Sequence, residues 1–171
     1  MEADTATLFR TRHLRVGPVD DRDLRPTLEV YRQCEDFLSL GPVARASPEM
    51  VRTDVEHSRQ AGGLYCGIWD GHGLQVGVLD VIPQPRDGTA FLELLMIGRP
   101  YRERGYGAEV LAALESYLQS TYSTGVLGAG VQVNNTSAIR FWQSHGFQIG
   151  TEQRAMPDGT TTYAMTKALS E

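Results

Sequence analysis

The segment that most constrains the fold is a nearly uncharged run, TAFLELLMI at residues 89–97, which leads into a basic loop and a helix-forming stretch. A continuous apolar run of this length is typical of a strand that is covered on both faces. The loop and the helix start read RPYRERGYGAEVLAAL, and Gly105 and Gly107 lie where the helix begins. Glycine costs about 1 kcal/mol relative to alanine inside a helix, so this position indicates a requirement other than helix stability.

The rest of the chain alternates strand-like and helix-like segments around this central strand. Hydrophobic alternation and turn residues predict the strands, while caps such as Ser47 followed by Pro48 predict helix starts. The expected strands span residues 13–19, 63–70, 74–82, 89–98, 125–133 and two segments around the turn at 157–159, and the expected helices span 23–38, 47–60, 105–120 and 134–147. This order, β-α-α-β-β-β-α-β-α-β-β, predicts an α/β (α+β) fold with a mixed sheet of about seven strands and helices on both faces.

Length and composition fit one soluble domain over residues 1–171, which we expect to be ordered from about residue 8 to about residue 170. No apolar run approaches the roughly 20 residues of a membrane-spanning helix, and the start MEADTATLFR lacks a hydrophobic leader. We therefore expect a cytoplasmic protein with no membrane partner. The formal net charge of −5 argues against nucleic-acid binding and permits a cationic ligand.

Cysteine and histidine residues predict neither a metal site nor a disulfide. Cys34 and Cys66 lie far apart and outside any C-x-x-C or His/Cys cluster. His57, His72 and His145 have no motif partner, so we interpret them as surface or packing residues and expect no metal.

The basic loop has the features of a phosphate-binding site. Arg102, Gly105 and Gly107 form R-x-x-G-x-G at a helix start, where backbone N–H groups and the positive end of the helix dipole can face an anion. Arg99 and Arg104 add positive charge nearby. A solvated basic turn is the alternative. The Gly-Lys-Ser/Thr ending of a P-loop is missing, and a dinucleotide fingerprint fits poorly because only one glycine pair follows the arginine.

Two motifs in this order resemble the signature regions of the GNAT superfamily of acetyl-CoA-dependent N-acetyltransferases. They are L-x-L-L-M-I-x-x-x-Y-R-x-R-G-Y-G at residues 92–107 and N-x-x-x-A-I-x-F-W-x-x-x-G-F at residues 134–147. The preceding segments also match the element order of that fold, so the resemblance covers nearly the whole chain. It implies a single N-acetyltransferase-like domain, acetyl-CoA as co-substrate and, as is common among such chains, a possible homodimer.

The resemblance also implies a set of cofactor-binding residues. The phosphate loop would wrap the CoA pyrophosphate, the end of the central strand would be bulged and pair with pantetheine, and an asparagine would contact the pantetheine arm. These positions are, respectively, Arg102, Glu103, Arg104, Gly105, Tyr106 and Gly107; Leu95, Met96 and Ile97; and Asn135. Phe141 and Trp142 are helical neighbours, so we expect one to face the core and the other to line the cofactor wall, with Trp142 as the candidate cofactor contact. Core packing of both side chains is the alternative.

Glu93 is the candidate catalytic base. An aliphatic amine with a pKa of about 10 is protonated at neutral pH and must lose a proton before it attacks. Glu93 is the only charged residue in AFLELLMI, and a period of two places it on the same strand face as Leu95 and Ile97. A structural carboxylate and a ligand for a cationic substrate are the alternatives. Asp80 is the second candidate, for which a solvated acid at a strand edge is the preferred interpretation.

Two positions depart from the pattern that many relatives share. Trp142 stands where many relatives have a tyrosine that protonates the leaving thiolate, and an indole N–H is no useful acid. Gly130 stands where ribosomal-protein N-terminal acetyltransferases have glutamate, which argues against a peptide N-terminus as acceptor.

Acceptor contacts are expected from the first two helices and the hairpin strands. Tyr31, Glu35, Asp36 and Phe37 combine acidic and aromatic groups that suit a cationic amine, although a solvated helix end with a core phenylalanine would look the same. The leading hypothesis is acetyl transfer to the primary amine of a small molecule by direct attack in a ternary complex. A non-catalytic acyl-CoA-binding or sensor domain, and a protein lysine or N-terminal acetyltransferase, are the alternatives.

Overall fold

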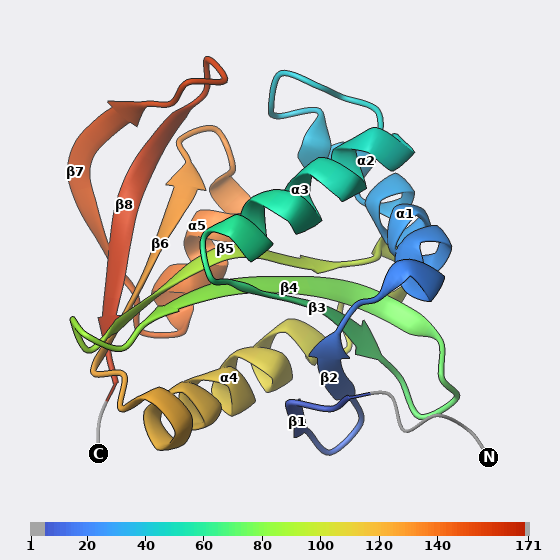
Figure 1. Ribbon diagram of the computed structural model, residues 1–171. Helices are drawn as coiled ribbons and strands as arrows, with labels where there is room; N and C mark the ends of the chain where they lie inside the picture. Colours follow the sequence, from blue (N-terminus) through green and yellow to red (C-terminus); the bar gives the residue numbers. More distant parts are fainter. Residues whose placement is uncertain (1–5, 170–171) are drawn as a thin grey trace.

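The computed structural model describes residues 6–169 and confirms the predicted element order around one central sheet (Figure 1). The strands are β1 (Phe9–Arg10), β2 (Arg15–Pro18), β3 (Leu64–Trp69), β4 (Gln75–Gln84), β5 (Thr89–Ile97), β6 (Val126–Gln132), β7 (Gln148–Ala155) and β8 (Thr161–Ala168). The helices are α1 (Leu24–Gln33), α2 (Glu35–Leu38), α3 (Pro48–Gln60), α4 (Tyr106–Tyr122) and α5 (Thr136–Ser144), with short 3-10 turns at Asp21–Asp23 and Arg99–Tyr101. Residue 170, placed in the expected ordered range, lies outside the described residues.

The sheet is mixed, as predicted, but has eight strands in the order β1-β2-β3-β4-β5-β6-β8-β7. Strands β5 and β6 pair in parallel, and the other neighbouring strands pair antiparallel. The additional strand, β1, is only two residues long and pairs with β2 through Phe9 and Val16. Two residues are too few to leave a recognisable hydrophobic alternation in the sequence.

Helix α3 begins at its predicted cap, whereas the first expected helix is interrupted at Cys34. Ser47 caps α3 through its side chain, which accepts a hydrogen bond from the Met50 amide, and Pro48 occupies the first turn. The single helix expected over residues 23–38 is instead two helices, because Cys34 leaves helical geometry and ends α1. No helix within residues 6–169 is long and apolar enough to cross a membrane.

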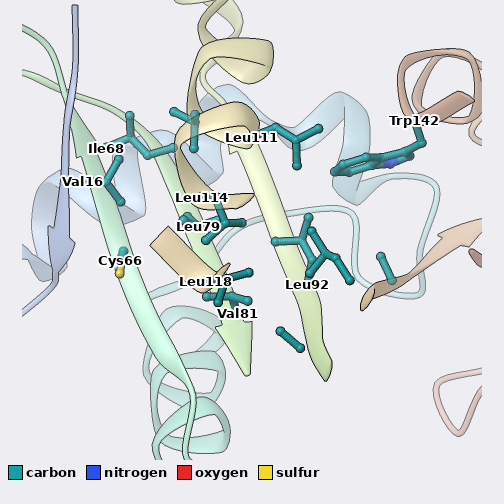
Figure 2. Packing of buried hydrophobic residues seen from close by; sticks show 14 of the residues in the cluster. Val16, Cys66, Ile68, Leu79, Val81, Leu92, Leu111, Leu114, Leu118 and Trp142 are labelled. Atoms are coloured by element: carbon teal, nitrogen blue, oxygen red, sulfur yellow. The ribbon is translucent and has the colours of Figure 1, made fainter. Parts of the chain in front are cut away.

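Helices cover the two faces of the sheet and create two cores. Helix α4 packs beneath the sheet, while α1, α2 and α3 lie above it (Figure 1). Leu111, Leu114 and Leu118 of α4 are buried against strand residues such as Leu79 and Leu92 (Figure 2). On the other face, buried side chains of α1 and α3 pack against β3, β4 and β5. Each fully buried leucine contributes about 1.5 to 3 kcal/mol of hydrophobic free energy, so both faces stabilise the fold.

The sheet opens between β5 and β6. Their pairing covers only residues 89–92 of β5 and residues 126–129 of β6. Beyond this point β5 continues beside β4 to Ile97, whereas β6 continues beside β8 to Gln132. Figure 1 shows β6 rising with β7 and β8 away from the β3–β5 layer. The facing backbone edges of β5 and β6 therefore have no partner strand there.

A β-bulge lies at Glu93. Asp80 of β4 pairs with Leu94, and Val81 pairs with Leu92, so Glu93 is an extra residue in β5. The bulge interrupts the period of two, because Leu92 and Leu95 both pack in the α4-side core, whereas Leu94 packs on the α1–α3 side. The predicted shared face of Glu93 with Leu95 and Ile97 is therefore wrong. The predicted bulge position, residues 95–97, is also wrong, because these residues pair regularly with β4.

Candidate functional site

A cavity of about 640 Å³ lies at the opening between β5 and β6. This volume is in the range of small-molecule binding sites. Ala129, Val131 and Trp142 line it and belong to the α4-side core, whereas Glu93 and Leu94 line it from the α1–α3 side. The cavity therefore passes through the sheet and joins its two faces.

Nine of the residues predicted for the site line this cavity. They are Phe37, Glu93, Leu95, Met96, Ile97, Arg102, Gly107, Asn135 and Trp142, and the cavity is also lined by Asp36 and Phe141, which the sequence analysis named beside Phe37 and Trp142. Glu103, Arg104, Gly105 and Tyr106 belong to the adjoining loop and to the start of α4, and Tyr31, Glu35 and Asp80 are not among the lining residues.

The start of α4 has an open backbone. Gly105 is the N-cap residue with a φ of 78°, and no side chain caps the helix. The first N–H groups of a helix have no intrahelical partner, so they are available to an anion. A β-carbon built at Gly105 would meet no protein atom within 4 Å. Glycine is thus favoured by the left-handed backbone rather than by crowding within the chain, and the surface there is open to a ligand.

Arg102 is engaged by the protein itself. Its guanidinium donates two hydrogen bonds to the Asp36 carboxylate, at 2.6 and 3.1 Å, and its Nε donates to the Ile97 carbonyl at 2.9 Å. The hydrogen bond from Arg102 lowers the pKa of Asp36. Arg102 thereby connects α2 to the end of β5. The Asp36 carboxylate is paired with Arg102 and is not free to bind the acceptor amine. Arg99 and Arg104, both exposed, carry the remaining positive charge of the loop.

The cavity wall on the α5 side is made by Asn135, Phe141 and Trp142. Asn135 is buried and caps α5, because its Oδ1 accepts a hydrogen bond from the Ala138 amide at 3.2 Å. Trp142 is 9% exposed and makes edge-on contacts with Phe141 and Phe147. We expected one of these two aromatic residues in the core and the other on the cavity wall. Instead, Phe141 and Trp142 both line the cavity, and Trp142 also belongs to the core.

Glu93 is the exposed residue of the bulge and faces the α1–α3 side. Burial raises the pKa of its carboxyl group, while His57 lowers it and Asp54 raises it. Both neighbours belong to α3. A carboxylate with a raised pKa is a stronger base than a free glutamate, which suits proton abstraction.

Asp80 is buried, so its interpretation as a solvated acid at a strand edge is wrong. Its side chain is on the central strand β4, beneath α3, and the residue is only 6% exposed. The Ser58 hydroxyl donates a hydrogen bond to Asp80 at 2.6 Å. Burial raises the pKa of Asp80 to about 6, against the lowering effect of that hydrogen bond.

Tyr31 is a buried member of a hydrogen-bond network rather than a surface ligand. Its hydroxyl donates to Asp54 at 2.7 Å and lies 2.5 Å from the Tyr65 hydroxyl. Burial raises the pKa of both tyrosines. Sequence reasoning missed Asp54, Ser58 and Tyr65. Asp54 and Ser58 are four residues apart on α3, and the buried Val51 lies one turn before Asp54. This helical spacing is the signal that could have identified Asp54 and Ser58 as residues on the buried face of α3.

Sequence reasoning also missed the contribution of the β7–β8 hairpin. Arg154, Met156, Thr160 and Thr162 line the cavity from these strands and their turn. The alternation of Thr162 and Ala164 with Tyr163 and Met165 was visible in the sequence, but the sequence did not reveal which face turns toward the cavity.

Residues 27–147 match the acetyltransferase (GNAT) family. A probable spermine N(1)-acetyltransferase of Bacillus subtilis subsp. natto is 31% identical over 67 residues, which are 39% of this chain and 44% of that protein. The matches span about half the length of the curated relatives.

Two solved structures are similar over most of the chain. RimL, a ribosomal L7/L12 alpha-N-protein acetyltransferase in complex with coenzyme A, has a TM-score of 0.77 at 12% identity and covers 96% of this chain and 98% of its own. The spermidine N-acetyltransferase of Vibrio cholerae, in complex with CoA and spermine, has a TM-score of 0.73 at 13% identity and covers 91% and 95%. At these identities the likeness shows the fold. The match over residues 27–147 shows that the chain belongs to the acetyltransferase (GNAT) family.

Proposed function

We propose that the protein is an N-acetyltransferase that moves an acetyl group from acetyl-CoA to the primary amine of a small molecule, by direct attack in a ternary complex. The observation that carries this proposal is the cavity that crosses the sheet. Open helix amides lie at one side of it and Glu93 lies at the other. The names of the relatives, which include spermine and spermidine acetyltransferases as well as a protein acetyltransferase, are consistent with amine acceptors.

The open backbone at the sheet fits the acetyl-CoA co-substrate of this family. The amides at the start of α4 would hold the pyrophosphate, and Arg99 and Arg104 would add charge. The unpaired edges of β5 and β6 would hydrogen bond to an extended, amide-bearing arm in the manner of an added strand. Bound there, acetyl-CoA supplies the activated acetyl group. Backbone N–H groups of β5 are the donors available to polarise its thioester carbonyl.

Glu93 would take the proton of the attacking amine. An ammonium group enters from the α1–α3 side, where Glu93 lines the cavity and Asp54 and Asp80 lie in the layer behind it. These acids give that side a negative potential, which attracts a cation. Because the pKa of Glu93 is raised, it lies closer to the pKa of the amine, and a smaller difference between the two pKa values favours proton transfer.

The test is acetyl-CoA-dependent thiol release against polyamines, aminoglycosides, amino acids and an N-terminal peptide, with CoA affinity measured by calorimetry. We expect CoA binding and turnover of at least one class of small amine. Turnover of the peptide alone would contradict the small-molecule acceptor. Tight CoA binding with no turnover of any class would favour a non-catalytic acyl-CoA sensor.

A further inference from the structure

The acceptor side of the cavity has a floor of small side chains. On β6, Leu127, Ala129 and Val131 pack in the α4-side core, so Gly130, which lines the cavity, faces the opposite side. Ala164 of β8 is the register partner of Gly130 and shares that face. Between β5 and β7 the floor is therefore open enough to hold a ligand that lies across the strands.

Two charged residues lie at opposite edges of this floor. Glu93 is on β5, and Arg154 is on β7, where it pairs in register with Thr162 of β8. Thr162 lies two residues from Ala164 and therefore faces the same side. Glu93, Thr162 and Arg154 all line the cavity. A ligand that touches both charges must lie across β6 and β8, because the two strands that carry the charges are three strand spacings apart, each about 4.8 Å.

Arg154 is a free cation in the described part of the chain. It is exposed, and its side chain forms no hydrogen bond or ion pair with any of residues 6–169. The other arginine of the cavity, Arg102, is neutralised by Asp36. Asp158 also lines the cavity, but its Oδ1 accepts hydrogen bonds from the amide and the hydroxyl of Thr160, at 2.9 and 2.6 Å, which hold it in the β7–β8 turn.

We propose that the acceptor is a small molecule with an amine at one end and an anionic group, a carboxylate or a phosphate, several bonds away. Arg154 binds the anionic group and thereby places the amine at Glu93. The inference rests on the proposed acetyltransferase function and specifies its substrate class. An arginine favours carboxylate and phosphate groups and repels a second ammonium group, so a polyamine is the less favoured ligand.

The test uses four acceptors that differ only at the end remote from the amine. They are 6-aminohexanoate, 6-aminohexyl phosphate, 1-aminohexane and 1,6-diaminohexane. We expect the acid or the phosphate to exceed the monoamine and the diamine in kcat/KM by about tenfold or more, the usual value of a charge-assisted hydrogen bond. Whichever of the two anionic compounds is preferred identifies the group that Arg154 binds. Equal turnover of all four, or preference for the diamine, would overturn the proposal while leaving the acetyltransferase function intact.

Substitutions at Arg154 add a residue-specific readout. Arg154→Gln is expected to raise KM for the anionic acceptors about tenfold with kcat nearly unchanged, and to leave the kinetics of 1-aminohexane unaffected. Arg154→Lys should retain most of the preference. Arg86→Gln, an exposed arginine in the β4–β5 turn outside the cavity, is the matched control. Equal KM values for wild type and Arg154→Gln with 6-aminohexanoate and 6-aminohexyl phosphate would remove Arg154 from acceptor binding.

Calorimetric titration of 6-aminohexanoate and 6-aminohexyl phosphate into the CoA-bound protein separates the two proposals. Binding that Arg154→Gln abolishes, without any turnover, would support the anionic subsite and contradict the acetyltransferase function. Absence of binding of both anionic compounds at millimolar concentrations would overturn the inference.

Discussion

The two faces of the sheet differ in how they bury polar groups. On the α4 side, Leu111, Leu114 and Leu118 pack in an apolar core. The α1–α3 side instead buries three hydrogen-bonded side-chain pairs, Thr27 with Gln75, Tyr31 with Tyr65 and Ser58 with Asp80. Burial disfavours the charged form of the Asp80 carboxyl group, so the second face gives up some stability. The comparison indicates that α4 supplies stability, while the α1–α3 side positions the groups that face the acceptor.

The largest effect on folding is expected on the α4 side. Leu114 is fully buried, so Leu114→Ala should lower the free energy of unfolding by about 2 to 5 kcal/mol through lost burial and a residual cavity. Urea denaturation measures this value, and the folded variant should keep its KM for the acceptor. Leu74→Ala, at a 48% exposed leucine, is the control and should cost far less. Similar losses for the two variants would contradict the role of the α4-side core in stability.

Substitution of Asp80 measures how much folding stability the buried carboxyl group costs on the α1–α3 side. Its pKa is raised from an ordinary value of 3.8 to about 6, so the folded state holds the proton more tightly than the unfolded state. The resulting stabilisation is present below pH 3.8 and is lost as pH rises through about 6. Asp80→Asn removes the buried charge and should therefore be more stable than wild type at pH 7, by up to about 3 kcal/mol.

The measurement for Asp80 is urea denaturation of wild type and Asp80→Asn at pH 4, 5, 6 and 7. The difference in free energy of unfolding should grow with pH across this window. Asp87→Asn, in the exposed β4–β5 turn, is the control and should show no such trend. A pH-independent difference for Asp80→Asn would contradict the burial of its charge.

A comparison of Gly105 with Gly62 distinguishes the cost of backbone strain from an effect on CoA binding, and both expected changes are smaller than those above. Gly105 and Gly62 have φ values of 78° and 75°, and a β-carbon at either position would meet no protein atom within 4 Å. Gly105→Ala and Gly62→Ala should therefore each cost about 1 kcal/mol of stability. Only Gly105→Ala should weaken CoA binding, by about tenfold, because its methyl group faces the proposed phosphate site. Equal CoA affinities of Gly105→Ala and Gly62→Ala, measured by calorimetry, would argue against a phosphate site at Gly105.

Local signals predicted much of the fold and of the phosphate loop. Ser47 with Pro48 marks a helix start through local hydrogen bonding, and the positive φ of Gly105 fits the glycine that the sequence placed there. Such features depend on neighbouring residues alone, which is why they can be read from one chain.

Features that depend on pairing between distant segments were not predictable. The bulge at Glu93 arises from the register of β5 against β4, and a single charged residue in an apolar run does not reveal an extra residue. Burial of Asp80 depends on α3 crossing β4, where Ser58 meets it. The Asp36–Arg102 ion pair joins residues 66 positions apart, so neither sequence motif indicates it.

The central claim is that Glu93, on the α1–α3 side of a cavity that crosses the sheet, acts as the base for an amine. The most direct test is kcat/KM against pH for wild type and Glu93→Gln, with an amine that the wild type acetylates and with CoA affinity measured in parallel. Turnover of the variant should fall by about 10² to 10⁴, while its CoA affinity should stay within a few fold of the wild-type value. Wild-type turnover by Glu93→Gln across the whole pH range would contradict the role of Glu93 as the base.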